Sequence, residues 1–336
     1  MRNALAFAAV CALAVSAPRT VEAQPAPYEG KTITIVVGYK PGGGYDATAR
    51  LLARHLPKHI PGSPTIIVQN MPGANSIIGA NHVYAVAKPD GLTLGTFNRN
   101  LPIAQLLSVA GVKYDMTKFA WIGSASSEAT ILAIRSDLPY KTFADLMKAK
   151  EPVVVGSTGP GANTHDFPLL IKEFLGANLK IVSGYSSSSD IMLAIERKEA
   201  DARAGSYSSM ARFIDRKLVH PVIRARASEP GIEQLPVDEA LASNPRAKTI
   251  MALRSAPEII GRPYVMPPGT PDQLVRTMRE AFAKVVNDKE LIAEATKAKM
   301  SLEYINGDEA LKVMKEVLAQ PKDIVDEFAK YIKFGE

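Results

Sequence analysis

A glycine-rich turn near the start of the chain has the residue types best suited to chemistry. Residues 38–46 read GYKPGGGYD and lie between a β-branched run and a pattern typical of a helix. Such a turn exposes main-chain N–H groups at a helix N-terminus, where the positive end of the helix dipole also attracts anions. Glycine suits this place because a side chain would keep a ligand away from the backbone. The segment therefore predicts a site for a small anion or a carboxylate group.

Two nucleotide-binding patterns and one purely structural role compete with this interpretation. A phosphate-binding P-loop requires Gly-Lys-Ser/Thr after its spacer, whereas Gly44 is followed by Tyr45 and Asp46, which excludes it. Residues 42–47 fit the G-x-G-x-x-A spacing of a dinucleotide fingerprint, but the next predicted strand ends at 69–70 without an acidic residue for a ribose. A plain turn in which Asp46 caps the helix remains the structural alternative.

Further polar turns follow later strands of the sequence. Residues 70–76 read NMPGANS and lie between a strand and a helix, as the first turn does. Residues 157–165 and 184–189 carry serine, threonine and glycine before helical patterns, and Tyr207 follows a short strand. Parallel strands place their carboxyl ends at one edge of a sheet, where open α/β sheets bind ligands. We therefore expect the main-chain amides of the first two turns to hold one carboxylate from two sides.

The residues predicted to contact the ligand are mostly small, polar or aromatic and come from these turns. They are Tyr39, Gly42, Gly43, Gly44, Tyr45, Asp46, Gly73, Ala74, Asn75, Ser76, Ser157, Thr158, Gly159, Asn163, Thr164, His165, Tyr185, Ser186, Ser187 and Tyr207. Asp46 is included because it is placed to orient the first turn, although an ion pair with Arg50 is the simple alternative. The basic residues considered for a second carboxylate are Lys40, Arg99, Arg203 and Arg254, and the sequence places none of them in a site.

The sequence predicts no catalytic residue, no metal site and no cofactor. It contains no G-x-S-x-G nucleophile elbow. Ser157, His165 and Asp166 are residue types of a catalytic triad, but adjacency in sequence is not triad geometry, so a periplasmic hydrolase using Ser157 and His165 stays the enzymatic alternative. His55 and His59 are four residues apart, yet no carboxylate completes a zinc motif around them.

Strand and helix patterns alternate in the elements that must position these turns. The first third predicts strands at 32–37, 65–68 and 92–97, separated by helices that begin near Ala47 and Ile77. This β-α-β-α-β order is typical of a parallel sheet covered by helices. The middle of the chain repeats the pattern, and the last part is mainly helical. With 336 residues, the length is that of about two domains.

The first 23 residues are predicted to be a cleaved secretory signal peptide. Arg2 gives the positive start, residues 4–17 are an apolar run too short to span a membrane, and residues 21–23 fit a small-x-small cleavage site. Cleavage removes Cys11, the one cysteine of the chain, which suits an oxidising compartment. We therefore expect a periplasmic protein. The net charge of +6 comes from scattered basic residues, so no nucleic-acid partner is expected.

Several loop motifs follow one another along the chain in a specific order. They are Pro41-Gly42-Gly43, Asp46, Ala49-Arg50, Asn70, Pro72-Gly73-Ala74, Gly79, Pro89-Asp90-Gly91 and Pro267-Pro268-Gly269-Thr270-Pro271. This ordered set resembles the Bug-type extracytoplasmic solute receptors of tripartite tricarboxylate transporters. The resemblance covers nearly all of the chain after the signal peptide.

The resemblance implies an α/β fold of two lobes, like the type II periplasmic binding proteins. Each lobe is expected to be a mainly parallel sheet flanked by helices, and two crossing strands are expected to form the hinge. The expected division is residues 24–125 for the first part of lobe 1, 126–260 for lobe 2 and 261–336 for the mainly helical C-terminal part of lobe 1.

The implied function is capture of a small carboxylate-bearing ligand between the lobes and its delivery to membrane transporter subunits. The first two turns would hold the carboxylate through backbone N–H groups, and the turn at 157–165 would close on the other end of the ligand. A sensor kinase is the alternative partner of the loaded receptor. We expect a monomer.

Overall fold

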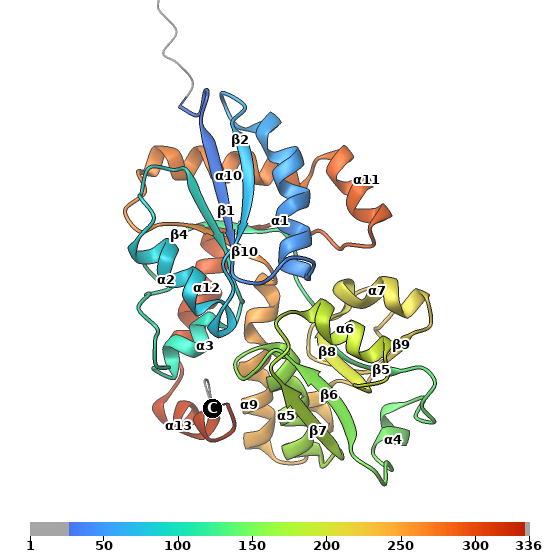
Figure 1. Ribbon diagram of the computed structural model, residues 1–336. Coiled ribbons are helices and arrows are strands. Elements are labelled where there is room, and N and C mark those ends of the chain that lie inside the picture. The colour runs from blue at the N-terminus through green and yellow to red at the C-terminus, as the bar shows by residue number, and fades with distance from the viewer. Residues whose placement is uncertain (1–26, 333–336) are drawn as a thin grey trace, which may run out of the picture.

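The computed structural model describes residues 27–332, and the predicted signal peptide lies outside this range. Within the described range, the chain forms a six-stranded sheet with the order β11-β4-β10-β3-β1-β2 and a five-stranded sheet with the order β7-β6-β8-β5-β9. We call the parts built on these sheets the first lobe and the second lobe. Figure 1 shows them as two separate bodies, each with helices packed on its sheet. The expected two-lobed α/β fold is confirmed.

The bounds of the elements are as follows. The strands are β1 (Thr32–Val37), β2 (Thr65–Asn70), β3 (Thr93–Thr96), β4 (Ala120–Ser124), β5 (Thr130–Arg135), β6 (Val153–Ser157), β7 (Leu179–Ser183), β8 (Ala202–Ser206), β9 (Val219–Arg224), β10 (Pro263–Met266) and β11 (Ile305–Asn306). The α-helices are α1 (Gly44–His55), α2 (Ile77–Ala85), α3 (Leu101–Leu106), α4 (Phe143–Leu146), α5 (Asn163–Leu175), α6 (Ser188–Glu196), α7 (Tyr207–Asp215), α8 (Asp238–Leu241), α9 (Pro245–Ser255), α10 (Asp272–Val286), α11 (Lys289–Lys297), α12 (Gly307–Leu318) and α13 (Lys322–Tyr331). Short 3-10 helices are η1 (Leu56–His59), η2 (Ala74–Ser76) and η3 (Ala256–Ile260).

The first lobe begins with the predicted β-α-β-α-β unit. Strand β1 pairs in parallel with β2 on one side and with β3 on the other. Ile33, Ile35 and Val37 are fully buried, and such β-branched side chains pack well on a pleated surface, which favours a central strand here. Because β1, β2 and β3 run in one direction, the turns that follow them lie at the same edge of the sheet.

Both sheets are mixed, which corrects the expectation of mainly parallel sheets. In the first lobe β10 runs antiparallel to β3 and β4, and in the second lobe β5 runs antiparallel to β8 and β9. The strands β4, β5, β9 and β10 adjoin the segments that cross between the lobes. From these segments the chain enters the first sheet through β10 and the second sheet through β5, and these two strands run opposite to the parallel units, whereas β4 and β9 run in the same direction as those units.

Two crossing segments connect the lobes. They are residues 125–129, between β4 and β5, and residues 225–262, between β9 and β10. The two segments are joined where Glu128 N donates a hydrogen bond to Glu258 O at 3.0 Å. They therefore form a paired hinge rather than two independent linkers. The residue boundaries expected for the lobes stay a prediction.

An apolar cluster beside the hinge contains side chains from both lobes, and we call it the seam. Its buried members include Ile103 of α3, Leu170 of α5, Met251 of α9, Val317 of α12 and Phe328 of α13. The ring centroids of Phe174 in α5 and Tyr331 in α13 are 4.7 Å apart. Helix α13 thus packs against α9 and α5, and Figure 1 shows it beside α9, on the side of α9 that faces away from the second sheet.

We expect Gly261→Ala to lower the free energy of unfolding by about 3 kcal/mol or more. Gly261 has φ +23°, and a Cβ added there would collide with the backbone oxygen of Ser126 in the other crossing segment. The matched control is Gly269→Ala, since Gly269 also has a positive φ (+78°) but nothing within 4 Å of an added Cβ. It should cost about 1 kcal/mol. Urea denaturation measures both, and equal losses would contradict a close-packed hinge.

Candidate ligand-binding site

A cavity of about 80 Å³ lies between the two lobes. Its lining residues are Tyr39, Gly43, Gly44, Tyr45, Asn98, Arg99, Glu128, Thr158, Ala162, Asn163, Thr164, Ser187, Ser188, Arg203, Gly205, Ser206, Ser209 and Arg262. These residues come from both lobes and from both crossing segments. The cavity therefore lies where a two-lobed binding protein has its cleft.

Hydrogen bonds between the lobes surround this cavity. Ser189 Oγ of the second lobe donates to Gly42 O of the first turn at 2.7 Å. Asn98 Nδ2, which follows β3, donates to Gly161 O at 3.0 Å. These direct contacts show that the lobes are closed on one another.

The N-terminus of α1 faces the cavity, as the sequence predicts. The N-cap residue Gly43 is extended (φ −83°, ψ 174°), and no side chain caps the helix. Within residues 27–332, the amides of Gly43, Gly44 and Tyr45 have no hydrogen-bond acceptor. Free N–H groups at a helix N-terminus bind anions. The first turn therefore offers a ready anion site on the first-lobe side.

Asp46 orders this turn from behind. Its Oδ2 accepts a hydrogen bond from Gly42 N at 2.9 Å, and its Oδ1 accepts one from Asn70 Nδ2 at 2.9 Å. Burial raises the pKa of Asp46, but the ion pair with Arg50 and these hydrogen bonds outweigh it and hold the pKa below its usual range. The carboxylate is thus ionised and satisfied internally. The amide of Gly42 is occupied, which corrects its prediction as a donor to the ligand.

Three helices of the second lobe also begin at the cavity. Residues from the first turns of α5, α6 and α7 line it, including Asn163, Ser188 and Ser209. In the part of the chain that the structure describes, the amides of Asn163 and Ser188 have no acceptor. Four helix dipoles therefore point their positive ends toward one small volume, which favours a negatively charged ligand.

Tyr45 links the first turn to the hinge. Its ring stacks on Tyr39 with centroids 5.2 Å apart. Its hydroxyl accepts a hydrogen bond from Arg99 N at 3.0 Å and donates one to Gly261 O at 3.3 Å. The first turn is thereby fixed to the crossing segment and to the turn after β3.

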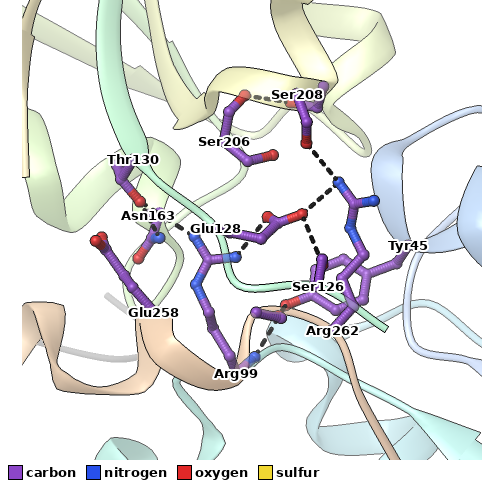
Figure 2. A network of polar contacts seen from close by, with 12 residues as sticks. Tyr45, Arg99, Ser126, Glu128, Thr130, Asn163, Ser206, Ser208, Glu258 and Arg262 are labelled. Carbon is purple, nitrogen blue, oxygen red and sulfur yellow. Dashed lines mark hydrogen bonds and ion pairs between the residues drawn. The ribbon is translucent and has the colours of Figure 1, made fainter. Parts of the chain in front are cut away.

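Glu128 of the shorter crossing segment lies between two buried arginines (Figure 2). Arg99 Nη1 lies 2.8 Å from Glu128 Oε2, and Arg262 Nη2 pairs with Glu128 Oε1. All three side chains are at most 5% exposed. Burial raises the pKa of Glu128, but the Arg262 and Arg99 cations outweigh it and hold the pKa below its usual range. Glu128 is therefore ionised and neutralises one of its two partners.

Arg203 is a third buried arginine at the cavity. It lies on the central strand β8 and is 4% exposed. Its Nη2 donates to Ser209 Oγ at 2.9 Å, while its buried Nε has no hydrogen-bond partner among the described residues. Burial lowers the pKa of Arg203 to about 10, which leaves the group charged at neutral pH.

The structure brings together eight of the predicted ligand contacts. Those that line the cavity are Tyr39, Gly43, Gly44, Tyr45, Thr158, Asn163, Thr164 and Ser187. Gly42 lines an adjoining cavity, and Asp46 lies behind the turn. The others lie outside the cavity lining: Gly73, Ala74, Asn75, Ser76, Ser157, Gly159, His165, Tyr185, Ser186 and Tyr207.

The second turn does not join the first at the cavity. Ala74, Asn75 and Ser76 all have positive φ (44°, 50° and 82°), which folds the turn tightly on itself. Ser76 Oγ accepts a hydrogen bond from Asn98 N at 3.2 Å, and Asn75 Nδ2 donates to Pro160 O in the second lobe. In this closed form, the second turn supports the turn after β3 and contacts the opposite lobe.

The triad residue types do not form a triad. Ser157 Oγ is fully buried and accepts a hydrogen bond from Gly159 N at 2.9 Å. His165 Nδ1 lies 3.2 Å from Asp166 Oδ1 and makes no hydrogen bond with Ser157 within the described range. Burial raises the pKa of Asp166. Ser157 thus closes the turn after β6.

Sequence reasoning missed Asn98, Glu128 and Arg262 at the cavity. It named Arg99 and Arg203 without placing them, and the structure puts both in the lining. The available signal was that these charged residues stand within short runs of small or apolar residues. Charged side chains in such runs are buried only when they are paired or have a function. Of the other basic candidates, Lys40 is exposed and Arg254 is buried in an ion pair with Glu258 at 3.1 Å.

A group of possible metal ligands lies outside the lining of this cavity. Among the described residues, His55, Asp288 and Glu290 place ligand atoms within 4.8 Å of one another. Lys58 Nζ pairs with Asp288 at 3.0 Å and with Glu290 at 2.6 Å. An ammonium group thus occupies the position between the two carboxylates.

We expect Glu128→Gln to lower the free energy of unfolding by about 3–5 kcal/mol, because it leaves two buried guanidinium groups without their counter-charge. The matched control is Glu303→Gln, which removes an exposed carboxylate whose partner is Ser127. It should change the free energy by less than about 0.5 kcal/mol. Urea denaturation of both variants checks this, and similar stabilities would show that Glu128 does not hold the arginines together.

Comparison with known proteins places the chain in a family. A family model described as tripartite tricarboxylate transporter family receptor matches residues 48–329. A UPF0065 protein from the TAR-I ttuE-ttuC' intergenic region of Agrobacterium vitis is 31% identical over 180 residues, which are 52% of this chain and 51% of that protein. The chain spans about half the length of the curated relatives it matches.

Solved structures share the fold over most of the chain. The periplasmic binding protein BugD is 20% identical with a TM-score of 0.71, over 90% of this chain and 97% of that one. MatC from Rhodopseudomonas palustris with bound malate is 19% identical with a TM-score of 0.68, over 90% of this chain and 99% of that one. None of the helices in residues 27–332 combines the length and apolarity needed to cross a bilayer. Since the family model matches most of the chain, this protein belongs to the receptor family of the tripartite tricarboxylate transporters.

Proposed function

We propose that this protein is a periplasmic receptor that captures a small organic carboxylate between its two lobes and delivers it to the membrane subunits of a tripartite tricarboxylate-type transporter. The observation that carries the proposal is the cavity, at which four helix N-termini and three buried guanidinium groups meet a single carboxylate, that of Glu128. Such a site attracts an anion and holds it without any reactive group.

The comparisons support a carboxylate as that anion. MatC, which shares the fold, has malate bound. The cavity of about 80 Å³ and the adjoining one of about 150 Å³ suit a small ligand. The predicted signal peptide supports a periplasmic location. The receptor family and the occupied hydroxyl of Ser157 both speak against the hydrolase alternative.

Binding in this geometry couples capture to closure. The free amides of Gly43 and Gly44 belong to the first lobe, whereas those of Asn163 and Ser188 belong to the second. A carboxylate-bearing ligand that reaches both sets binds the closed form more tightly than the open form, and so shifts the population toward closure. The closed surface would then be recognised by the transporter.

A thermal-shift screen of the signal-free protein tests the proposal. The panel holds saturated monocarboxylates and dicarboxylates of three to eight carbons, malate, and the matching neutral diols. We expect at least one acid to raise Tm by several degrees at millimolar concentration, since ligand binding to the folded state stabilises it by mass action. The diols should give no shift. A panel in which every acid behaves like its diol would overturn the proposal.

The acid with the largest shift then tests the α1 amides. We expect Gly44→Pro to weaken its binding about 10- to 100-fold relative to Gly44→Ala, because one charge-assisted hydrogen bond is worth about 1.5–3 kcal/mol. Both variants bring a Cβ against Arg262, but the first helical position tolerates proline, and only the proline lacks the N–H. Isothermal titration measures the two affinities. Equal values would place the acid away from α1.

A further inference from the structure

The charged side chains that line the cavity do not balance. They are Arg99, Glu128, Arg203 and Arg262. Glu128 pairs with Arg99 and with Arg262, so one negative charge serves two positive ones. Glu258 lies near Arg99 in Figure 2, but it is outside the cavity lining and is held by Arg254 at 3.1 Å. The lining thus carries two positive charges in excess.

Arg203 holds one of these two charges by itself. Among residues 27–332 it forms no ion pair, whereas Arg99, Arg254 and Arg262 each pair with a buried carboxylate. Its one side-chain hydrogen bond goes to the neutral hydroxyl of Ser209, and its Nε is buried without a partner. A charged group that is buried and unpaired is costly, so a structural role alone does not explain it.

The surroundings of Arg203 leave room for an anion. Gly205, two residues later on β8, has no side chain, and a Cβ there would lie 3.0 Å from Arg203 Nη2. The guanidinium group of Arg203 therefore lies over the backbone of Gly205, where no side chain separates it from the cavity. An adjoining cavity of about 150 Å³, also lined by Arg203 and by Arg262, adds Arg212 and contains no acidic side chain in its lining. The nearest protein counter-charge, Glu128, is already shared by two other arginines.

We propose that Arg203 binds one of two anionic groups of the ligand, so that the receptor selects doubly charged acids over singly charged acids of the same size. This inference rests on the proposed function, since it assigns the ligand's second charge within the same site. The excess charge shared by Arg99 and Arg262, together with the α1 amides, takes the other anionic group. A singly charged acid would leave one buried guanidinium group unmatched.

The test compares charge-matched pairs of acids. The probes are succinate, glutarate and adipate and the monoamide of each, which keeps the size and shape but removes one charge. Isothermal titration at pH 7.5, where both carboxyl groups are ionised, gives the affinity ratio of diacid to monoamide. For the best-bound pair, we expect the wild-type ratio to be about 10- to 100-fold, the value of one charge-assisted contact.

Arg203 variants show whether this residue produces the ratio. In Arg203→Gln the ratio should fall to within about threefold of unity, while the monoamide keeps its wild-type affinity within about threefold. Arg203→Lys keeps the positive charge and should retain a preference for the diacid. A ratio that stays unchanged in Arg203→Gln would overturn the proposal.

Stability separates this role from a structural one. Because the charge of Arg203 is unpaired and desolvated, Arg203→Gln without ligand should unfold within about 2 °C of the wild type or above it. The matched control is Arg254→Gln, which removes a buried arginine that pairs with Glu258, and it should lower Tm by about 5 °C or more. A loss in Arg203→Gln as large as in the control would make Arg203 structural and contradict the proposal.

The outcomes also keep the two proposals apart. If the wild type binds neither diacids nor monoamides, while the thermal-shift screen finds no other acid, the proposed function fails. If it binds both members of each pair equally well, the receptor role stands and the role of Arg203 is refuted.

Discussion

The shared carboxylate of Glu128 is the interaction on which the closed structure depends. It lies in the shorter crossing segment and pairs with Arg99, from the turn after β3, and with Arg262, from the end of the longer crossing segment. Three parts of the chain that are far apart in sequence thus meet at one buried ion. Removing it would leave two desolvated cations facing each other, a situation that water cannot relieve at this depth.

The same arrangement explains why the site can hold an acid without acid–base chemistry. Helix N-termini and guanidinium groups are hydrogen-bond donors held in fixed positions. An ionised carboxylate binds them through its negative charge and its acceptor oxygens, without any proton transfer. Asp46 illustrates the principle within the protein, because its carboxylate is already satisfied by Gly42 N, Asn70 and Arg50. The N–H groups that remain free at the cavity are those that no acceptor in the described part of the chain reaches.

Local patterns in the sequence predicted most of the elements and eight of the eighteen residues that line the cavity. The β-branched run at 32–37 and the glycine turn after it specify β1 and the start of α1, because strand propensity and glycine flexibility act over a few residues. The second turn was predicted at the same edge, which is right, but its place outside the cavity lining was not predicted. That depends on three consecutive positive φ angles at 74–76 and on Asn98, to which Ser76 is bonded.

The electrostatics of the site could not be predicted because they depend on contacts between distant segments. No local sequence feature distinguishes Arg203, which has no carboxylate partner within residues 27–332, from Arg254, which has one. The mixed direction of the sheets has the same origin, since it follows from where the chain crosses between the lobes.

The seam limits how such a molecule can open. Ile103, Leu170, Met251, Val317 and Phe328 come from both lobes and bury one another. A motion that pulled these side chains apart would transfer their apolar surface to water, at about 25 cal/mol for each Å². Rotation about an axis that passes close to them avoids that loss. The unliganded receptor would therefore open by rotation about an axis close to the seam. Substitutions in the seam would change the angle between the lobes in the unliganded protein without contacting the ligand.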